Sequence, residues 1–198
     1  MLAVGALAAA GSIGVLATRA EAGRPMAETR LHLADGTPIG KVTFYDAGST
    51  TEVDVVLRVP AGTTAVRAFH GFHVHANDVA DNGSGCVADP LQLASTWFVS
   101  ADGHYKAADE LHGDHRGDMP SLHLDSDGRA SARFTIERID AATLSGTAVI
   151  VHAGRDNFNN IPLGTADDQY TANSAAALDK TQKTGNAGDR IACGVISS

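Results

Sequence analysis

The chain has 198 residues, of which 43% are hydrophobic and 19% charged, and it contains 21 glycines and 6 prolines. This length and composition are typical of one turn-rich globular domain and exclude a largely disordered chain. The formal net charge of −8 at pH 7 argues against nucleic acid as a partner, because phosphate backbones select basic surfaces.

The first part of the chain is an apolar run that ends in small residues. Ala20-Glu21-Ala22 matches the A-x-A pattern of a signal-peptide cleavage site, so we predict an export segment at residues 1–22 and a domain at 23–198. The run is short for a membrane span and lacks a basic beginning, so its true start and a retained anchor stay open. We expect an exported protein, in the periplasm, the cell envelope or outside the cell, without a stable membrane span in the domain.

Cys86 and Cys193 are the only cysteines. An exported chain meets an oxidising compartment, where a lone pair of cysteines commonly forms a disulfide. A bridge would close a loop of about one hundred residues and stabilise the fold by about 4–5 kcal/mol in the chain-entropy model. Two separate buried thiols are the alternative.

Turn-bounded apolar segments predict β-strands throughout the domain. Residues 51–59 alternate hydrophobic and polar side chains with a period of two, and Asp127-Gly128 is typical of a tight hairpin turn. The predicted strands are residues 28–34, 39–47, 51–59, 67–75, 121–126, 129–139, 147–153 and 190–196. No segment has the period of an amphipathic helix. The pattern predicts an all-β fold, an eight-stranded antiparallel sandwich or barrel.

Two long polar segments, residues 76–120 and 154–189, interrupt this series of strands. Loops of this length inside a compact domain are usually functional or disordered. The first segment is rich in histidine, so a metal ion could order it. We therefore expect two long functional loops.

Histidines in three parts of the chain indicate metal binding. His73 and His75 are at positions i and i+2 of a predicted strand, so their imidazoles point to the same face and could chelate copper or zinc. Solvated surface histidines are the alternative for such a pair. His152 ends another apolar strand, and HGDHRGD (112–118) packs two imidazoles and the carboxylate of Asp118 into one tight turn within fifteen residues of His104. Nitrogen and carboxylate donors at this density suit zinc or copper rather than calcium, and together they predict two sites.

Four motifs resemble the copper,zinc superoxide dismutase family, in particular its exported bacterial branch. They are GFHVH (71–75), HRGDMPSL (115–122), IVHAG (150–154) and GNAGDRIACGVI (185–196). The resemblance covers about residues 28–198. It implies a Greek-key β-barrel and an enzyme that converts superoxide to dioxygen and hydrogen peroxide as an antioxidant defence outside the cytoplasm. Copper and zinc are the implied cofactors, and a homodimer is possible because the family contains both monomers and dimers.

The resemblance also implies a role for each site residue. The implied copper ligands are His73, His75, His104 and His152, and the implied zinc ligands are His104, which bridges the two metals, His112, His115 and Asp118. Asp156 corresponds to the carboxylate that links ligands of the two metals, and Arg190 to the arginine that guides the anion toward copper. Cys86 and Cys193 correspond to the family's intrasubunit disulfide. Lys180 and Lys183 either add a steering field or are solvated loop charges.

The zinc loop departs from the family pattern. His112 follows His104 by eight residues, which suits two ligands of one site, but His115 follows His112 by only three. Part of the loop therefore looks deleted. In one interpretation the turn from His112 to Asp118 still wraps the ion, with Gly113 and Gly117 permitting the backbone bends. In the other, His112 is a solvated loop residue and the zinc site is altered or empty.

Two other classes of function are considered. A copper storage or delivery module on the same barrel is the alternative to an enzyme, and an adhesive or structural sandwich is a third possibility.

The remaining histidines and two aromatic residues of the first long loop are expected to have structural roles. We expect His32 and His123 on outer strand faces and a structural role for His70. Trp97 and Phe98 are expected to pack within the first long loop or at a subunit contact.

Overall fold

The computed structural model describes residues 24–63, 65–83, 85–158 and 181–198, so the predicted export segment lies outside the described residues. The strands are β1 (Pro25–Leu33), β2 (Pro38–Asp46), β3 (Thr51–Arg58), β4 (Ala68–His70), β5 (Phe72–His75), β6 (Leu122–Leu124), β7 (Arg129–Ile136), β8 (Ala148–His152) and β9 (Arg190–Val195). The short 3-10 helices are η1 (Ala80–Asn82), η2 (Ala94–Thr96), η3 (Val99–Ala101) and η4 (Ala141–Thr143). Residues 181–184 are α-helical, which the sequence pattern did not predict. Within the described ranges, no helix has the length and apolar character needed to cross a membrane.

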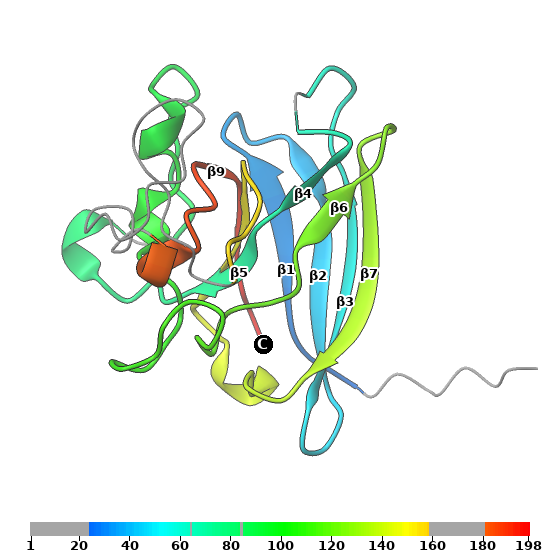
Figure 1. Cartoon of the computed structure of the whole chain (residues 1–198), viewed down its shortest axis with the longest axis vertical. Helices are drawn as coiled ribbons and strands as arrows, with labels where there is room; N and C mark the ends of the chain where they lie inside the picture. Colours follow the sequence, from blue (N-terminus) through cyan, green and yellow to red (C-terminus); the bar gives the residue numbers. More distant parts are fainter. Residues whose placement is uncertain (1–23, 64, 84, 159–180) are drawn as a thin grey trace, which may run out of the picture.

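Seven strands form one curled antiparallel sheet in the order β5-β8-β9-β1-β2-β3-β7, and β4 pairs with β6 in a second sheet. The neighbours β9–β1 and β3–β7 are distant in the sequence, so the chain crosses between strands rather than forming a simple meander. Figure 1 shows the sheet on one side of the molecule and the long loop that follows β5 on the other. The predicted all-β fold is confirmed.

The hydrophobic core follows from the period-two pattern of the strands. In β3 the side chains of Val53, Val55 and Leu57 are buried, whereas Val56 between them is 60% exposed. The antiparallel register places Val55 opposite Val42 of β2. Residues of the second sheet, among them Leu122, belong to the same hydrophobic cluster, so both sheets cover one core.

The predicted strand at residues 67–75 is two strands rather than one. β4 pairs with β6 and β5 pairs with β8, and the chain changes sheets at Gly71. At this position the Gly71 N–H donates to the carbonyl of Gly154, and the Gly71 carbonyl accepts from the N–H of His152. A Cβ at Gly71 would collide with Ala187, so the close approach of the second long loop requires glycine. His73 and His75 remain together in β5.

The predicted hairpin around Asp127-Gly128 is right for the turn and wrong for the strand pairing. Gly128 has a positive φ of 73°, and the N–H of Asp125 donates to the carbonyl of Arg129. Beyond the turn, however, β6 pairs with β4, and β7 pairs along its whole length with β3. A turn motif fixes local backbone geometry, whereas the pairing partner depends on where the other strands lie.

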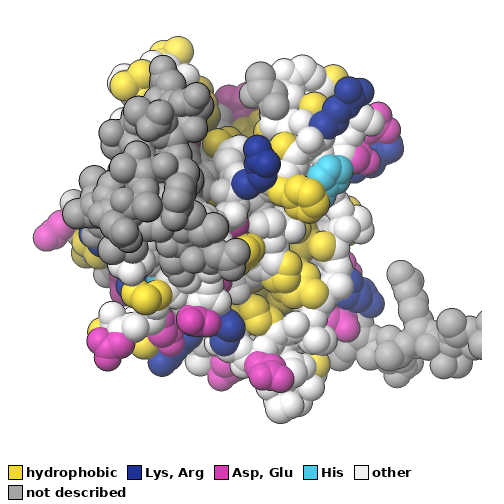
Figure 2. Space-filling model, viewed as in Figure 1, with side chains coloured by type: hydrophobic (Ala, Val, Ile, Leu, Met, Phe, Trp, Pro, Cys, Tyr) yellow, Lys and Arg dark blue, Asp and Glu magenta, His cyan; other side chains and the backbone are white. Residues whose placement is uncertain are grey.

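Hydrophobic side chains gather over β4 and β6 on the face shown in Figure 2. Phe69 of β4 is 53% exposed, and its ring centroid lies 4.9 Å from that of His123 on β6. His123 is exposed, as expected for an outer strand face, and His32 is half-buried. Neither histidine belongs to the groups of candidate metal ligands found among the described residues.

Candidate metal centre

The strand β5 presents its two histidines to the interior. His73 and His75 are both fully buried, so the interpretation of the pair as solvated surface residues is wrong. β5 pairs with β8, which ends in His152. Isolated bridges join His73 to Asp118 and His75 to His104, so the long loop lies directly beside β5. Three separate chain segments therefore bring histidines to one place.

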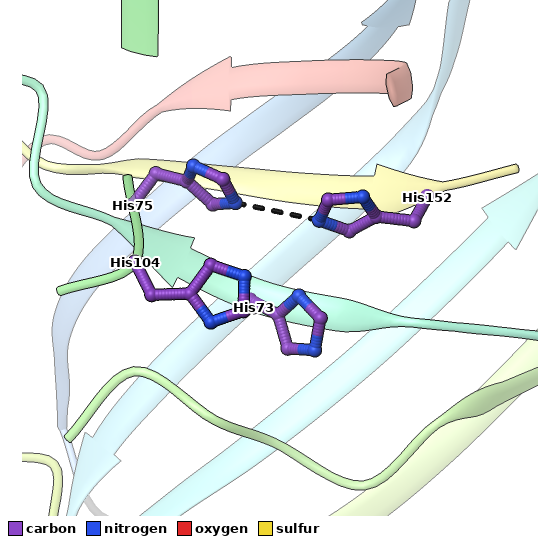
Figure 3. Close-up of side chains that lie close together, drawn as sticks. All are labelled: His73, His75, His104 and His152. Carbon is purple, nitrogen blue, oxygen red and sulfur yellow. Dashed lines mark hydrogen bonds between the residues drawn. The ribbon is translucent and has the colours of Figure 1, made fainter. Parts of the chain in front are cut away.

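Four buried histidines form a first group. Candidate ligand atoms of His73, His75, His104 and His152 all lie within 4.8 Å of one another. Figure 3 shows their imidazoles turned toward a common centre, with a dashed line between His75 and His152. The Nε2 atoms of these two residues are 3.4 Å apart. The arrangement can hold one transition-metal ion with nitrogen ligands.

A second group shares two histidines with the first and adds residues of the long loop. Its members are His73, His104, His112 and Asp118, and their candidate ligand atoms also lie within 4.8 Å of one another. His115 lies beside this group, with its Nδ1 atom 3.1 Å from Nδ1 of His104 and 3.3 Å from Oδ1 of Asp118. The Nδ1 atom of His104 faces this second group, because it is 2.8 Å from the same carboxylate.

Backbone carbonyls orient two histidines of the first group. The Nδ1 atom of His75 lies 2.8 Å from the carbonyl oxygen of Asp102, and Nδ1 of His152 lies 3.1 Å from that of Gly188. Hydrogen bonds at Nδ1 leave Nε2 of each ring available to a metal. In His70, by contrast, both ring nitrogens face carbonyl oxygens, those of His152 at 2.8 Å and Ala65 at 2.7 Å. The geometry matches the structural role predicted for His70.

The carboxylate of Asp156 joins the two groups. Its Oδ2 atom lies 2.6 Å from Nε2 of His73, and its Oδ1 atom lies 2.7 Å from Nε2 of His112. All three side chains are completely buried. The ring of Phe158 stacks on His112 with 5.5 Å between centroids. Asp156 thus contacts His73, which both groups share, and His112, which belongs to the second group alone.

Unsatisfied nitrogens in the cluster fit bound metal ions. Among the described residues, the buried atoms Nδ1 of His73, Nε2 of His104 and Nε2 of His115 have no hydrogen-bond partner. A buried polar atom left unpaired costs about 1–3 kcal/mol, so such atoms are rare unless they serve another purpose. Coordination would satisfy the nitrogens of His73 and His104, which belong to the groups above. Imidazole and carboxylate donors also match copper and zinc in chemical type.

Burial keeps three of the histidines neutral. Burial and the neighbouring His73 lower the pKa of His104 to about 3. Burial also holds the pKa values of His75 and His152 well below their usual range, and the positive charge of Arg190 contributes to both. Metal ligands must be deprotonated, so these imidazoles are ready to coordinate at neutral pH.

His112 behaves differently because two carboxylates face it. Burial opposes its charged form, but hydrogen bonds and charges from Asp118 and Asp156 raise the pKa of His112 to about 9. Burial would raise the pKa of Asp118, yet hydrogen bonds from His104, His112 and His115 hold this pKa below its usual range. His112 is only 1% exposed, so its interpretation as a solvated loop residue is wrong. The negative charge that attracts a proton here would equally attract a cation.

Arg190 is held against the long loop by two carbonyl groups. Its Nη1 atom donates to the carbonyl of Phe98, and its Nη2 atom donates to the carbonyl of Asp102, both at 2.5 Å. In the β8–β9 register Arg190 lies opposite His152. The guanidinium therefore has a fixed position near the first group of histidines.

A disulfide between Cys86 and Cys193 joins the same loop to β9, with 5.5 Å between the Cα atoms. The alternative of two separate thiols is therefore wrong. The bridge packs in a small cluster with Phe98 and Ile150, and Trp97 covers it from the loop. The indole N–H of Trp97 donates to a loop carbonyl at 2.9 Å, so both aromatic residues pack within the loop.

Comparison with known proteins agrees with this geometry. The model of the copper/zinc superoxide dismutase (SODC) family matches residues 38–196. The chain belongs to the copper/zinc superoxide dismutase family. A superoxide dismutase [Cu-Zn] of Mycolicibacterium paratuberculosis is 35% identical over 187 residues, which cover 92% of this chain and 78% of the relative. A superoxide dismutase [Cu-Zn] of Mycobacterium tuberculosis is 37% identical over 172 residues, covering 83% of this chain and 67% of the relative.

Solved structures of copper/zinc superoxide dismutases and related proteins share the fold. The Cu/Zn superoxide dismutase from Brucella abortus superposes with a TM-score of 0.59 at 23% identity, covering 86% of this chain and 99% of that one. A double mutant of a superoxide dismutase-like protein from Bacillus subtilis superposes with a TM-score of 0.58 at 21% identity, covering 85% and 95%.

The sequence analysis missed two residues of this dismutase-family site. Gly185 lies against His112 and Asp156, where a Cβ atom would collide with both side chains. Asp102 provides the carbonyl that both His75 and Arg190 contact. Neither residue type signals a role by itself, although Gly185 begins the motif at residues 185–196. Of the two lysines considered for steering, Lys183 is exposed and Lys180 lies outside the described residues.

Proposed function

We propose that this chain catalyses the disproportionation of superoxide to dioxygen and hydrogen peroxide, with copper held by the first histidine group. The observation that carries the proposal is the sharing of His104 between two buried groups. Its Nδ1 atom faces Asp118 and His115, while its buried Nε2 atom has no partner in the described part of the chain. A histidine with this environment is suited to bridge two metal ions.

The protein side chains prepare the site for a small anion. Held by His73, His75, His104 and His152, copper would supply the one-electron redox chemistry that disproportionation of superoxide requires. His75 and His152 stay neutral and are oriented by backbone carbonyls at Nδ1, so the Nε2 atom of each ring can serve as a metal ligand. Arg190 contributes a fixed positive charge, and its planar guanidinium suits a small oxyanion.

We further propose that His104, His112, His115 and Asp118 hold zinc despite the shortened loop. The burial of His112 and its contacts with Asp118 and Asp156 support a ligand role. The Gly113 N–H donates to Oδ2 of Asp118 at 2.6 Å, which closes the tight turn around the carboxylate. Zinc would hold the loop against β5 and fix the orientation of His104.

A copper storage or delivery module is the second candidate function. Such a protein needs copper ligands but has no need of an arginine fixed beside them by two carbonyl groups. The position of Arg190 therefore favours the enzyme.

The decisive experiment measures superoxide decay with protein loaded with copper and zinc. The wild type should accelerate decay, and His75→Ala should lose both copper and activity. His123→Ala is the matched control, because it removes an exposed histidine outside the cluster and should change neither property. A copper-loaded wild type without activity would favour storage or delivery. Activity in His75→Ala equal to the wild type would reject the assigned site.

Metal analysis tests the zinc site separately. We expect about one zinc ion per chain after loading, because three imidazoles and a carboxylate complete one tetrahedral zinc site, and loss of that zinc in His115→Ala and His112→Ala. A protein that binds only copper and retains full activity would reject the zinc assignment while leaving the copper site intact.

We also propose that the protein is exported. The Cys86–Cys193 disulfide supports this, because such bonds persist in oxidising compartments. The relative from Brugia pahangi, 28% identical, is named an extracellular superoxide dismutase. Fractionation of cells that produce the full chain, with mass spectrometry of its N-terminus, should find a product that begins at Gly23 outside the cytoplasm. An intact N-terminus in the cytoplasmic fraction would contradict the proposal.

A further inference from the structure

Asp102 has a backbone conformation that is almost restricted to glycine. Its φ is 64° and its ψ is −158°. A residue with a side chain is strained in this region and persists there only where the surrounding structure enforces it. The next residue, Gly103, could have adopted such a conformation without this strain. The position of a strained aspartate two residues before His104 therefore calls for a physical reason.

The carbonyl group of Asp102 connects two parts of the candidate active site. Its oxygen lies 2.8 Å from Nδ1 of His75 and accepts a hydrogen bond of 2.5 Å from Nη2 of Arg190. One peptide group thus orients a proposed copper ligand and the proposed anion-guiding arginine together. Rotation of this peptide would displace both side chains.

The carboxylate of Asp102 binds a different part of the chain from the two side chains that its carbonyl group contacts. Its Oδ2 atom accepts hydrogen bonds from the backbone N–H groups of Asp78 at 2.6 Å and Val79 at 2.8 Å. Its Oδ1 atom accepts a further bond from the side-chain amide of Asn82. These contacts anchor Asp102 to the part of the loop that directly follows β5.

Backbone hydrogen bonds continue the same connection. The N–H of Ala76 donates to the carbonyl of Gly103 at 2.9 Å, and the N–H of Asn77 donates to the carbonyl of Ala101 at 3.1 Å. The two chain segments therefore lie side by side, and Asp102 is held on both flanks. Its side chain adds the bonds that a glycine at this position could not make.

We propose that Asp102 is a positioning residue for dismutation: its carboxylate anchors the strained peptide whose carbonyl orients His75 and Arg190. The side chain makes its contacts with the loop and touches neither the proposed metal ligands nor the proposed path of the anion. The assignment of a role in dismutation rests on the proposed function. The geometric part, that the carboxylate fixes Arg190, can be tested without metal or substrate.

Two substitutions separate the contribution of the side-chain hydrogen bonds of Asp102 from that of its negative charge. Asp102→Gly relieves the backbone strain and removes every side-chain hydrogen bond. Asp102→Asn retains an oxygen acceptor but loses the negative charge. Asp81→Asn is the matched control, because Asp81 is exposed in the same loop and the substitution changes the net charge by the same amount.

The first measurement uses metal-free protein. We expect amide hydrogen exchange at Asp78 and Val79 to accelerate by about tenfold or more in Asp102→Gly, as loss of a charge-assisted hydrogen bond implies. The NMR signals of the Arg190 guanidinium should show increased mobility in the same variant. Asp102→Asn should lie between Asp102→Gly and the wild type, and Asp81→Asn should match the wild type. Unchanged exchange and unchanged Arg190 signals in Asp102→Gly would overturn the proposal.

The second measurement uses copper- and zinc-loaded protein, with azide as an anion probe. We expect azide affinity and the rate of superoxide decay to fall by about tenfold in Asp102→Gly, because an Arg190 that is no longer fixed binds an anion less well. Copper content should be unchanged. Azide affinity equal to the wild type would overturn the positioning role.

If the loaded wild type binds azide but does not consume superoxide, the proposed function fails while the positioning of Arg190 is still tested. If Asp102→Gly does not fold, Asp102→Asn must show the intermediate changes, and wild-type behaviour would reject the proposal.

Discussion

Oδ1 of Asp156 lies 2.7 Å from Nε2 of His112, and both side chains are fully buried. The other oxygen of Asp156 contacts His73, so one carboxylate spans the two groups of candidate metal ligands. Hydrogen bonds of this kind orient ligating imidazoles and increase their basicity. Asp156 therefore couples the two proposed sites without belonging to either.

We expect Asp156→Asn to weaken zinc binding by about 10–100-fold, the range typical of lost partners of metal-bound histidines. Competition titration with a chromophoric chelator measures the affinity. Asp109→Asn removes an exposed carboxylate from the same loop and should leave the affinity unchanged. Equal zinc affinity in both variants would mean that Asp156 does not support His112.

Gly185→Ala should disrupt the contact between His112 and Asp156. Gly185 has a φ of +60°, and an added Cβ would overlap the Oδ1 atom of Asp156 and the Nε2 atom of His112. We expect a loss of zinc from the loaded protein and a drop of about 1–3 kcal/mol in the free energy of unfolding. Gly146→Ala provides the control, because Gly146 has a similar positive φ of +90° and open space around it. A similar zinc content in both variants would count against the steric argument.

Zinc affinity should depend on pH through His112. Burial opposes its charged form, but Asp118 and Asp156 raise the pKa of His112 to about 9, so this ring carries a proton at neutral pH in the metal-free protein. Zinc binding must release that proton, and we expect the affinity to rise with pH by up to about tenfold per unit and to level off above pH 9. His104, whose pKa is lowered to about 3, is already neutral throughout this range and does not contribute an imidazolium proton. Chelator competition between pH 6 and 9 measures this slope in the wild type. A flat profile in the wild type would contradict the raised pKa.

Arg190→Glu should slow superoxide decay by at least about tenfold while copper content stays intact, because the substitution reverses the charge that attracts the anion. Arg190→Lys should retain more activity, since it preserves the charge but loses the planar donor group. Arg24→Glu makes the same change in net charge at an exposed position and should have little effect. Equal rates for all four proteins would remove Arg190 from the mechanism.

Removal of the Cys86–Cys193 disulfide should lower the free energy of unfolding by about 2–5 kcal/mol, as in other domains with a long closed loop. It should also increase the mobility of the Arg190 side chain, because the disulfide and the Arg190 hydrogen bonds both join β9 to the same loop. Denaturant titration of the Cys86→Ala/Cys193→Ala variant, with and without reductant, measures the effect. Only the wild type should respond to reductant. Insensitivity of the wild type would show that the bridge contributes little.

The sequence by itself determined the local features of this protein. The alternation in residues 51–59 gave β3 with its inward valines, because side-chain direction in a strand depends only on the neighbouring residues. The i, i+2 spacing placed His73 and His75 in one strand for the same reason. The sequence motifs also predicted membership of the copper/zinc superoxide dismutase family, whose model matches residues 38–196.

Only the tertiary structure decided which distant segments meet. Residues 67–75 divide at Gly71 because the second long loop approaches there, and no pattern within the segment reveals that approach. The spacing of His112 left its role open, whereas the folded chain buries it between Asp118 and Asp156. The carbonyl of Asp102 carries no sequence signal at all, since every residue has one. Contacts such as these depend on the path of the whole chain through space, and for that reason spacing and composition cannot predict them.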